Sequence, residues 1–204
     1  MTTETLTNSP SAIPAKTAET SAPIHPTLAE RWSPRSFEAA QPIDEAKLTA
    51  ALEAARWAPS AANSQPARFI VARRGSDAFA TIAASLMGFN AVWAGSASVF
   101  VVGVAEVADA DGKPRRWAEY DLGQALAHLS VQAHHDGLHV HQMGGFDVDA
   151  IRTGFSLPES LVPVTITALG TAASPDALPD DTLRTRELAP RTRLPLADLL
   201  LTNE

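Results

Sequence analysis

Three short stretches of this chain contain residues that could together bind an anion. They are residues 31–35 (Arg-Trp-Ser-Pro-Arg), 59–66 (Pro-Ser-Ala-Ala-Asn-Ser-Gln-Pro) and 191–195 (Arg-Thr-Arg-Leu-Pro). Guanidinium groups present paired N–H donors that match the oxygens of a phosphate monoester, and a hydroxyl group can satisfy a remaining lone pair. These residue types therefore predict a phosphate site, and any chemistry would come from the molecule that carries the phosphate.

The overall composition excludes several other classes of function. The chain has 204 residues, of which 45% are hydrophobic and 19% charged, as is typical of one folded domain. Its formal net charge of -7 argues against binding to nucleic acid or to an anionic membrane, because those proteins carry a basic excess. Without cysteine, the chain has no disulfide, thiolate nucleophile or iron–sulfur site, and a reducing, cytoplasmic location is the simplest expectation.

The N-terminal residues 1–25 have the composition of a flexible tail. They are rich in Ala, Ser, Thr and Pro, and Lys16 is their only basic residue. They lack the apolar block of a signal peptide. The longest apolar run of the chain, residues 99–105, is far shorter than the roughly 20 residues that span a bilayer, so we expect no membrane-spanning segment.

Hydrophobic periodicity predicts a mixture of helices and strands. Helices are expected over 44–57, around 76–86, from about Trp117 to a stop at Gly137, and from about Asp147. Strands are expected over 68–72, over 99–102 and around 164–167. Residues 174–198 contain four prolines, which favours an extended segment lying over another surface. The irregular order of these elements favours an α+β fold over a doubly wound one.

The ordered motifs resemble those of the FMN-dependent nitroreductase family across about residues 26–200. The likeness rests on Arg-x-Ser-x-Arg, Pro-Ser-x-x-Asn-x-Gln-Pro, Asn90, the turn Gly-Gly-Phe-Asp at 144–147 and the late Arg-x-Arg-x-Pro. It implies a nitroreductase-like α+β fold, with a central, mostly antiparallel sheet flanked by helices, in an intertwined homodimer. It further implies a tail over 1–25, an FMN-binding domain over 26–173, and an arm over 174–204 that completes the FMN site and the dimer.

The same resemblance implies which residues bind FMN. The phosphate would be held by Arg31, Ser33, Arg191 and Arg193. The pyrimidine edge of the flavin ring would be reached by Arg35 and Asn90, and a fixed guanidinium there would favour the reduced flavin. The partner chain would supply Pro59, Ser60 and Ala61, while Asn63 would bond the flavin or brace the same loop. Gly144 and Gly145 would let the backbone approach the ring. Trp32 and Met143 complete the predicted set.

The function implied by the resemblance is hydride transfer from NAD(P)H, through flavin N5, to a nitroaromatic, quinone or similar conjugated small molecule. Ping-pong kinetics would follow, and no catalytic side chain is assigned because the cofactor carries the chemistry. Two alternatives share the fold: a flavin oxidase or dehydrogenase of a secondary metabolite, and a non-catalytic flavin-binding or flavin-sequestering protein. A third alternative is a structural or phosphate-binding protein that binds no flavin. Larger family members have a helical lid where this chain has only residues 103–117, so its site is expected to be more open or differently covered.

Simpler interpretations exist for several of these residues. Taken alone, the arginines would form solvated surface pairs, and Ser60 and Asn63 would bond nearby backbone. The five clustered histidines are interpreted as helix-surface or interface residues rather than metal ligands, because Gly137 interrupts their shared face: His128, His134, His135, His139 and His141. Four large aromatic residues are expected in the core or at a dimer contact, with Phe146 also a candidate to stack on a substrate: Trp57, Trp93, Trp117 and Phe146.

Overall fold

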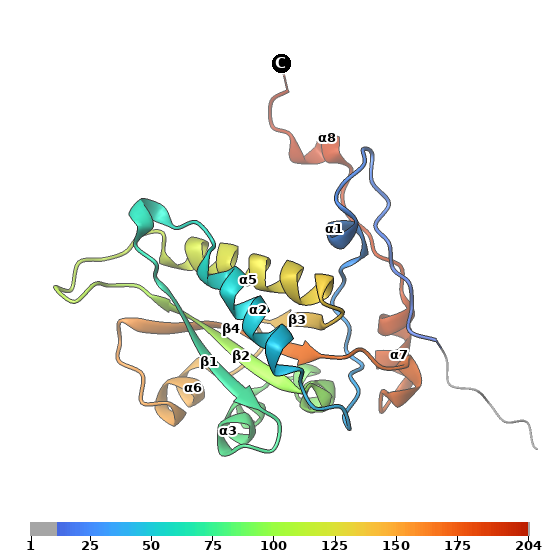
Figure 1. Cartoon of the computed structure of the whole chain (residues 1–204), viewed down its shortest axis with the longest axis horizontal. Helices are drawn as coiled ribbons and strands as arrows, with labels where there is room; N and C mark the ends of the chain where they lie inside the picture. Colours follow the sequence, from blue (N-terminus) through green and yellow to red (C-terminus); the bar gives the residue numbers. More distant parts are fainter. Residues whose placement is uncertain (1–11, 204) are drawn as a thin grey trace, which may run out of the picture.

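The computed structural model describes residues 12–203 as a four-stranded sheet with helices on both faces (Figure 1). The strands are β1 (Ala67–Arg73), β2 (Val99–Glu106), β3 (His139–Met143) and β4 (Leu161–Gly170). They run in the order β1-β2-β4-β3, and every neighbouring pair is antiparallel. The prediction of an α+β fold around a mostly antiparallel sheet is therefore confirmed.

The helices divide into two layers and an end group. Helices α2 (Glu45–Arg56) and α5 (Ala118–His135) cover one face of the sheet, and α3 (Asp77–Ser85) and α6 (Val148–Gly154) cover the other (Figure 1). The shorter helices α1 (Pro26–Glu30), α7 (Asp181–Leu188) and α8 (Leu196–Leu199) lie towards one end of the sheet. The remaining helical segments are α4 (Asn90–Trp93) and the 3-10 turns η1 (Ala61–Asn63), η2 (Ala94–Ser96) and η3 (Pro175–Ala177).

The central strand β2 explains why the core has two sides. Alternate side chains of a strand point to opposite faces. Phe100 and Val102 accordingly pack with α3 and α6, whereas Val101 packs with α2 and α5. Gly103 lies beneath α5, and a Cβ atom at this position would be 2.8 Å from Cδ1 of Leu126. The side chain of Leu126 thus packs directly against the backbone of β2 at this point.

The predicted helices and strands over residues 44–170 are confirmed within a few residues at each end. Asp44 accepts hydrogen bonds from two backbone amides and begins α2, and Gly137, at φ +81, follows the end of α5. Strand β3 was not predicted. The expectation that the histidines lie on a helix surface was wrong for His139 and His141, because β3 pairs with β4 and places both of them in the sheet.

The expectation of an extended chain over residues 174–198 was wrong for α7. Asp180 accepts a hydrogen bond from the backbone N–H of Leu183 and starts the helix, although the segment is rich in proline and aspartate. Leu183 and Glu187 lie one turn apart and are both buried, so a single inward face stabilises α7. These tertiary contacts explain why the segment is helical although its local sequence favours an extended chain.

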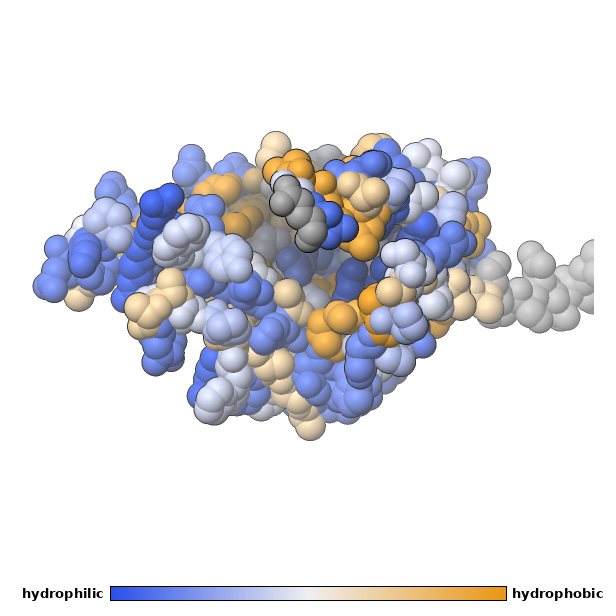
Figure 2. All heavy atoms as spheres, turned by 90° about the horizontal axis from the view of Figure 1, so that it is seen from above, coloured by the Kyte–Doolittle hydropathy of each residue, from blue (hydrophilic) through white to orange (hydrophobic). Residues whose placement is uncertain are grey.

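The large aromatic residues fall into two groups. Trp93 and Phe146 are buried in the core, as predicted, whereas Trp57 and Trp117 are 75% and 52% exposed. Further exposed apolar side chains occur on α1 and the C-terminal arm, including Leu28, Leu194, Leu196 and Leu199. Seen from above, hydrophobic side chains gather around a hollow in this face of the molecule (Figure 2). Exposed apolar side chains that gather on one face can mark an interaction surface.

Candidate functional site

Residues 31–36 form an extended segment in which side chains alternate between two sides. Arg31, Ser33 and Arg35 are partly exposed, whereas Trp32 and Pro34 are buried. Alternation of this kind follows from extended backbone, in which successive Cβ atoms point to opposite sides. The Arg-x-Ser-x-Arg spacing therefore places its two guanidiniums and its hydroxyl on the same side.

Buried polar groups from distant parts of the chain hold this segment in place. The carboxylate of Glu187, only 1% exposed, accepts hydrogen bonds from the backbone N–H of Arg35 at 2.9 and 3.0 Å and from that of Ser36 at 3.3 Å. It also lies 3.7 Å from the Arg35 guanidinium. Burial raises the pKa of Glu187, and the two backbone donors and the nearby cations oppose that effect. Glu187 thus fixes the position of Arg35.

His141 supports the same segment from the sheet. Its Nδ1 lies 2.9 Å from the carbonyl oxygen of Pro34, and its ring centroid lies 4.6 Å from that of Trp93. Burial lowers the pKa of His141 to about 4, although the Pro34 carbonyl favours the protonated form. The ring is therefore neutral at pH 7, and Nδ1 must carry the proton because a carbonyl oxygen only accepts.

The predicted arginines converge on one pocket, here called the cationic pocket. It has a volume of about 210 Å³, and its polar lining side chains are Lys16, Arg31, Ser33, Arg35, Arg186, Arg191 and Arg193. Burial lowers the pKa of Arg31, and the positive charges of Arg191 and Arg193 lower it further. The single negative charge of Glu187 offsets only one of the positive charges around the pocket. The pocket therefore has the excess of positive charge that a phosphate dianion requires.

Arg191 also builds the wall of the cationic pocket. One of its guanidinium nitrogens donates to the carbonyl oxygens of Lys16, at 2.7 Å, and Ala29, at 2.5 Å. Arg193 donates to the neighbouring carbonyl of Thr192. Both arginines line the pocket. Some of the N–H donors of Arg191 are already bonded to backbone carbonyls, and these bonds hold the N-terminal segment against the C-terminal arm.

The predicted asparagine and glycines form a second group beside the cationic pocket. The side-chain Nδ2 of Asn90 donates to the carbonyl oxygen of Gly145 at 3.2 Å, and a Cβ at Gly145 would lie 2.9 Å from that nitrogen. A Cβ at Gly144 would meet no described atom within 4 Å, so the backbone there borders open space. Arg186 of the cationic pocket lies 4.3 Å from the ring of Phe89 and links the two groups.

The side chain of Met143, like that of Trp32, is buried. It is therefore not exposed to a ligand. Its carbonyl oxygen accepts a hydrogen bond from the hydroxyl of Thr165 at 2.9 Å. Met143 therefore contributes to the position of the glycine turn that follows it.

The loop over residues 59–66 has an unusual backbone. Ala62, Asn63 and Gln65 have φ values of 52, 55 and 47, although none is glycine. The buried carboxylate of Asp121 accepts a hydrogen bond from the N–H of Ala61 at 3.0 Å, and Ser60 Oγ accepts one from the N–H of Gln65 at 3.0 Å. Left-handed backbone of this kind persists only where the surroundings hold it, and these two bonds do so.

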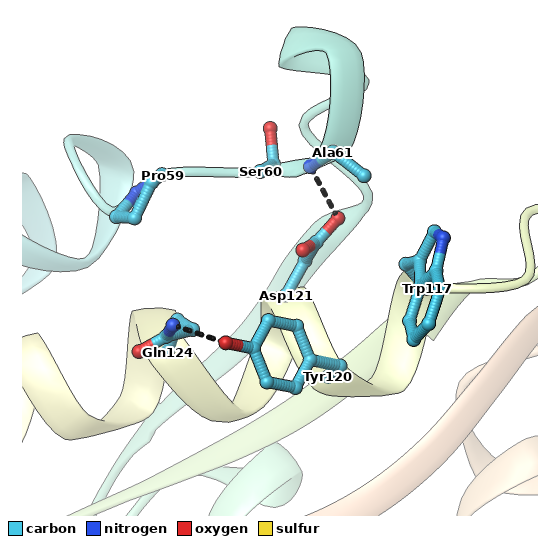
Figure 3. A pocket seen from close by; sticks show the side chains of 7 residues that line it. All are labelled: Pro59, Ser60, Ala61, Trp117, Tyr120, Asp121 and Gln124. Carbon is cyan, nitrogen blue, oxygen red and sulfur yellow. Dashed lines mark hydrogen bonds between the residues drawn. The ribbon is translucent and has the colours of Figure 1, made fainter.

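A second pocket, here called the aromatic pocket, lies between this loop and the first turn of α5 (Figure 3). Its volume is about 400 Å³, within the usual range for small-molecule sites, and it is lined by Pro59, Ser60, Ala61, Trp117, Tyr120, Asp121 and Gln124. The rings of Trp117 and Tyr120 are 6.3 Å apart and inclined by 74°. Gln124 donates to the Tyr120 hydroxyl at 2.9 Å. This surface can stack against a flat ligand.

The two pockets lie at opposite ends of α5. Trp117 and Asp121 belong to its beginning, whereas His134 near its end is close to the cationic pocket. The pKa of His134 is lowered by burial first, and Glu30, Arg31 and Arg191 also act on it. A helix of 18 residues is about 27 Å long. The structure therefore unites Arg31, Ser33 and Arg35 with the late arginines, but not with the loop over 59–66.

The sequence interpretation missed Tyr120 and Gln124 of the aromatic pocket. It also missed five residues that line or support the two pockets: Lys16, Asp121, His141, Arg186 and Glu187. Arg186 stands close before the recognised arginine pair and could have been included with it. Lys16 is the only basic residue of an otherwise neutral or acidic segment, which was a usable signal. The other three act through bonds to distant backbone, for which the local sequence has no pattern.

Among residues 12–203, no three His, Cys, Asp or Glu side chains are arranged to hold a metal ion. Nor does any helix in that range have the length and apolar character needed to cross a membrane.

Comparison with known proteins places these pockets in a wider context. A model described as "Nitroreductase family" matches residues 28–171. An uncharacterized 15.4 kDa protein of Mycolicibacterium smegmatis, from the ask 5' region, is 34% identical over 143 residues, which are 66% of this chain and 95% of that protein. A crystal structure of an oxidoreductase containing FMN is 35% identical, with a TM-score of 0.85 over 91% of this chain and 94% of that one. A putative nitroreductase from Desulfovibrio desulfuricans, in complex with FMN, is 22% identical, with a TM-score of 0.70 over 87% and 95%.

Proposed function

Because the chain belongs to the nitroreductase family, we propose that it is an FMN-dependent oxidoreductase. The observation that carries this proposal is the convergence of Arg31, Ser33, Arg35, Arg191 and Arg193 on one pocket with excess positive charge. A phosphate monoester fits that donor set, and the open backbone at Gly144 offers space for a flat ring nearby. The similar oxidoreductase that contains FMN supports the same cofactor.

Each residue group has a distinct task in this proposal. Arg31, Ser33 and Arg193 would bind the phosphate, and Asn90 would bond the ring edge while the glycine turn supports it. Bound FMN would supply two-electron chemistry, accepting hydride from one substrate and delivering it to another. Arg35, held in place by Glu187, would stabilise negative charge at the ring edge without reorganisation. We assign no obligate catalytic side chain.

We also propose that the active form is a homodimer. The predicted FMN-binding residues fall at opposite ends of α5, too far apart for one small ligand. A second copy related by two-fold symmetry could bring its loop over 59–66 to the cationic pocket of the first. The exposed apolar side chains on α1 and the C-terminal arm offer the surface that such a contact would bury.

NAD(P)H is proposed as the hydride donor, and a nitroaromatic, quinone or similar conjugated molecule as the acceptor. The exposed rings of Trp117 and Tyr120 beside the loop over 59–66 favour flat partners of this kind. Residues 107–117 fold back as a short turn in which the N–H of Arg115 donates to the carbonyl of Val107 at 2.7 Å. They form no helix over the pocket. Donor and acceptor could therefore enter in turn, which gives ping-pong kinetics.

An absorbance spectrum of the purified chain tests this proposal. We expect a flavin spectrum after incubation with FMN and gel filtration, followed by bleaching when NADH or NADPH is added without oxygen. A colourless preparation that does not bind added FMN would contradict the cofactor assignment. Bleaching by an organic donor but not by either nicotinamide would instead favour an oxidase or dehydrogenase on the same fold.

A further inference from the structure

Residues 12–25, here called the N-terminal strap, lie against the site although they precede the family match at residue 28. The backbone N–H of Ala18 donates to the carbonyl of Ala29 at 2.8 Å. The guanidinium of Arg191 donates to the carbonyl of Lys16 at 2.7 Å. The strap is thereby attached to both α1 and the C-terminal arm, the two elements that border the cationic pocket.

The side chain of Lys16 is directed to the cationic pocket. Its ammonium nitrogen lies 4.5 Å from the centroid of the Trp32 ring and donates to the carbonyl oxygen of Ala189 at 2.8 Å. Both of these neighbours, like Lys16 itself, line the pocket. An ammonium group has three N–H donors, and among the described residues the Ala189 carbonyl accepts one of them. Donors therefore remain for a ligand in the pocket.

The surroundings of Lys16 disfavour its charged form when no ligand is bound. Burial lowers the pKa of Lys16, Glu187 opposes this, and the positive charges of Arg35 and Arg191 lower it again. The strap thus adds a further cation to a pocket already crowded with guanidiniums. A surface contact without a ligand would gain little from this arrangement, because like charges repel.

We propose that Lys16 is a further ligand of the cofactor phosphate, and that the N-terminal strap closes the cationic pocket over that phosphate. The inference rests on the proposed FMN function. It adds a residue outside the matched family region to the binding site. The ligand class it specifies is a phosphate monoester, so Lys16 would discriminate FMN from riboflavin, which has the same ring but no phosphate.

The test is a comparison of FMN and riboflavin affinities, measured by fluorescence titration of the full-length chain. For Lys16→Met we expect FMN affinity to fall by about 10-fold to 100-fold, as for the loss of one charged hydrogen bond. Riboflavin affinity should be unchanged. Lys16→Arg should retain most of the FMN affinity because it keeps the charge. Lys113→Met, in an exposed turn far along the chain, is the matched control and should bind both flavins as the wild type does.

Three results would overturn the proposal, and they differ in meaning. An equal loss of FMN and riboflavin affinity in Lys16→Met would show that Lys16 only supports the fold. Unchanged FMN affinity would show that it does not contact the phosphate. If the wild-type chain bound neither flavin, the proposed function itself would fail, and Lys16 with it. Circular dichroism melting of each variant separates loss of binding from loss of folding.

Discussion

The cationic pocket and the aromatic pocket lie at the two ends of α5 and are built differently. The first joins segments far apart in the sequence and fixes them with the buried Glu187 and the partly buried His141. The second consists of one loop and the first two turns of α5, with exposed rings. Charged ligands need donors at fixed positions, because reorganisation would cost much of the binding energy. Stacking on a ring tolerates more variation, so the aromatic end can be open.

The largest effect should come from removing charge at the cationic end. In the double variant Arg31→Ala with Arg193→Ala, FMN affinity should fall by at least about 100-fold, since each charged hydrogen bond is worth roughly 1.5 to 3 kcal/mol. Fluorescence titration measures this loss. Arg56→Ala with Arg73→Ala removes two exposed, ion-paired arginines elsewhere and serves as the control. Equal FMN binding in both double variants would remove the cationic pocket from cofactor binding.

Mixing variants tests whether the two ends belong to one site in a dimer. Ala61→Trp should block the loop while leaving the cationic pocket intact. When this variant is unfolded, mixed with the Arg31→Ala, Arg193→Ala chain and refolded, random pairing should restore FMN binding at about a quarter of the sites. No restoration, despite proven subunit exchange, would show that the loop does not serve the partner's pocket.

A smaller effect is expected from pH at the cationic end. The partly buried His141 has a pKa of about 4 against an ordinary value of 6.5, so protons bind preferentially to the unfolded chain between these values. The contribution of His141 to stability should be complete above pH 6.5 and should be lost as the pH falls towards 4, by up to about 3 kcal/mol. Urea unfolding at pH 7.5 and 5.0 measures the loss. His141→Asn should show a shallower decline, and an unchanged slope would exclude His141 as its source.

At the aromatic end, the next largest effect should come from the buried carboxylate of Asp121, which holds the loop over 59–66. Asp121→Ala leaves the N–H of Ala61 without its acceptor and should lower the free energy of unfolding by about 1 to 3 kcal/mol. Urea titration compares it with Asp111→Ala, which removes an exposed carboxylate from a turn. If both variants lost equal stability, the bond to Ala61 would have no special role in holding the loop.

The smallest effect should come from the exposed ring of Trp117. Trp117→Ala should raise KM for a quinone or nitroaromatic acceptor by about 2-fold to 10-fold, the value of one aromatic contact, and leave FMN affinity unchanged. Steady-state kinetics measure both. Trp57→Ala removes an exposed tryptophan that does not line the aromatic pocket. A matching KM change in that control would argue against a specific stacking role.

Local sequence patterns predicted most of the fold and the arginines, but not what positions them. Helix α2 and strand β2 were recognisable because each buries a regular set of apolar side chains. Glu187, in contrast, bonds the backbone of Arg35 across 152 residues, and His141 bonds Pro34 across 107. A buried carboxylate or imidazole of this kind looks like any surface residue in the sequence. Its role depends on tertiary proximity, which periodicity does not encode.

The close approach at Gly103 leaves no spare room between β2 and the side chains of α5. A Cβ atom at this position would lie 2.8 Å from Cδ1 of Leu126 and 3.3 Å from Cγ2 of Thr165, so any larger residue would require these side chains to move. Leu126 belongs to the helix that carries Asp121 near its beginning and His134 near its end, so its packing here helps to set the position of the helix between the two pockets.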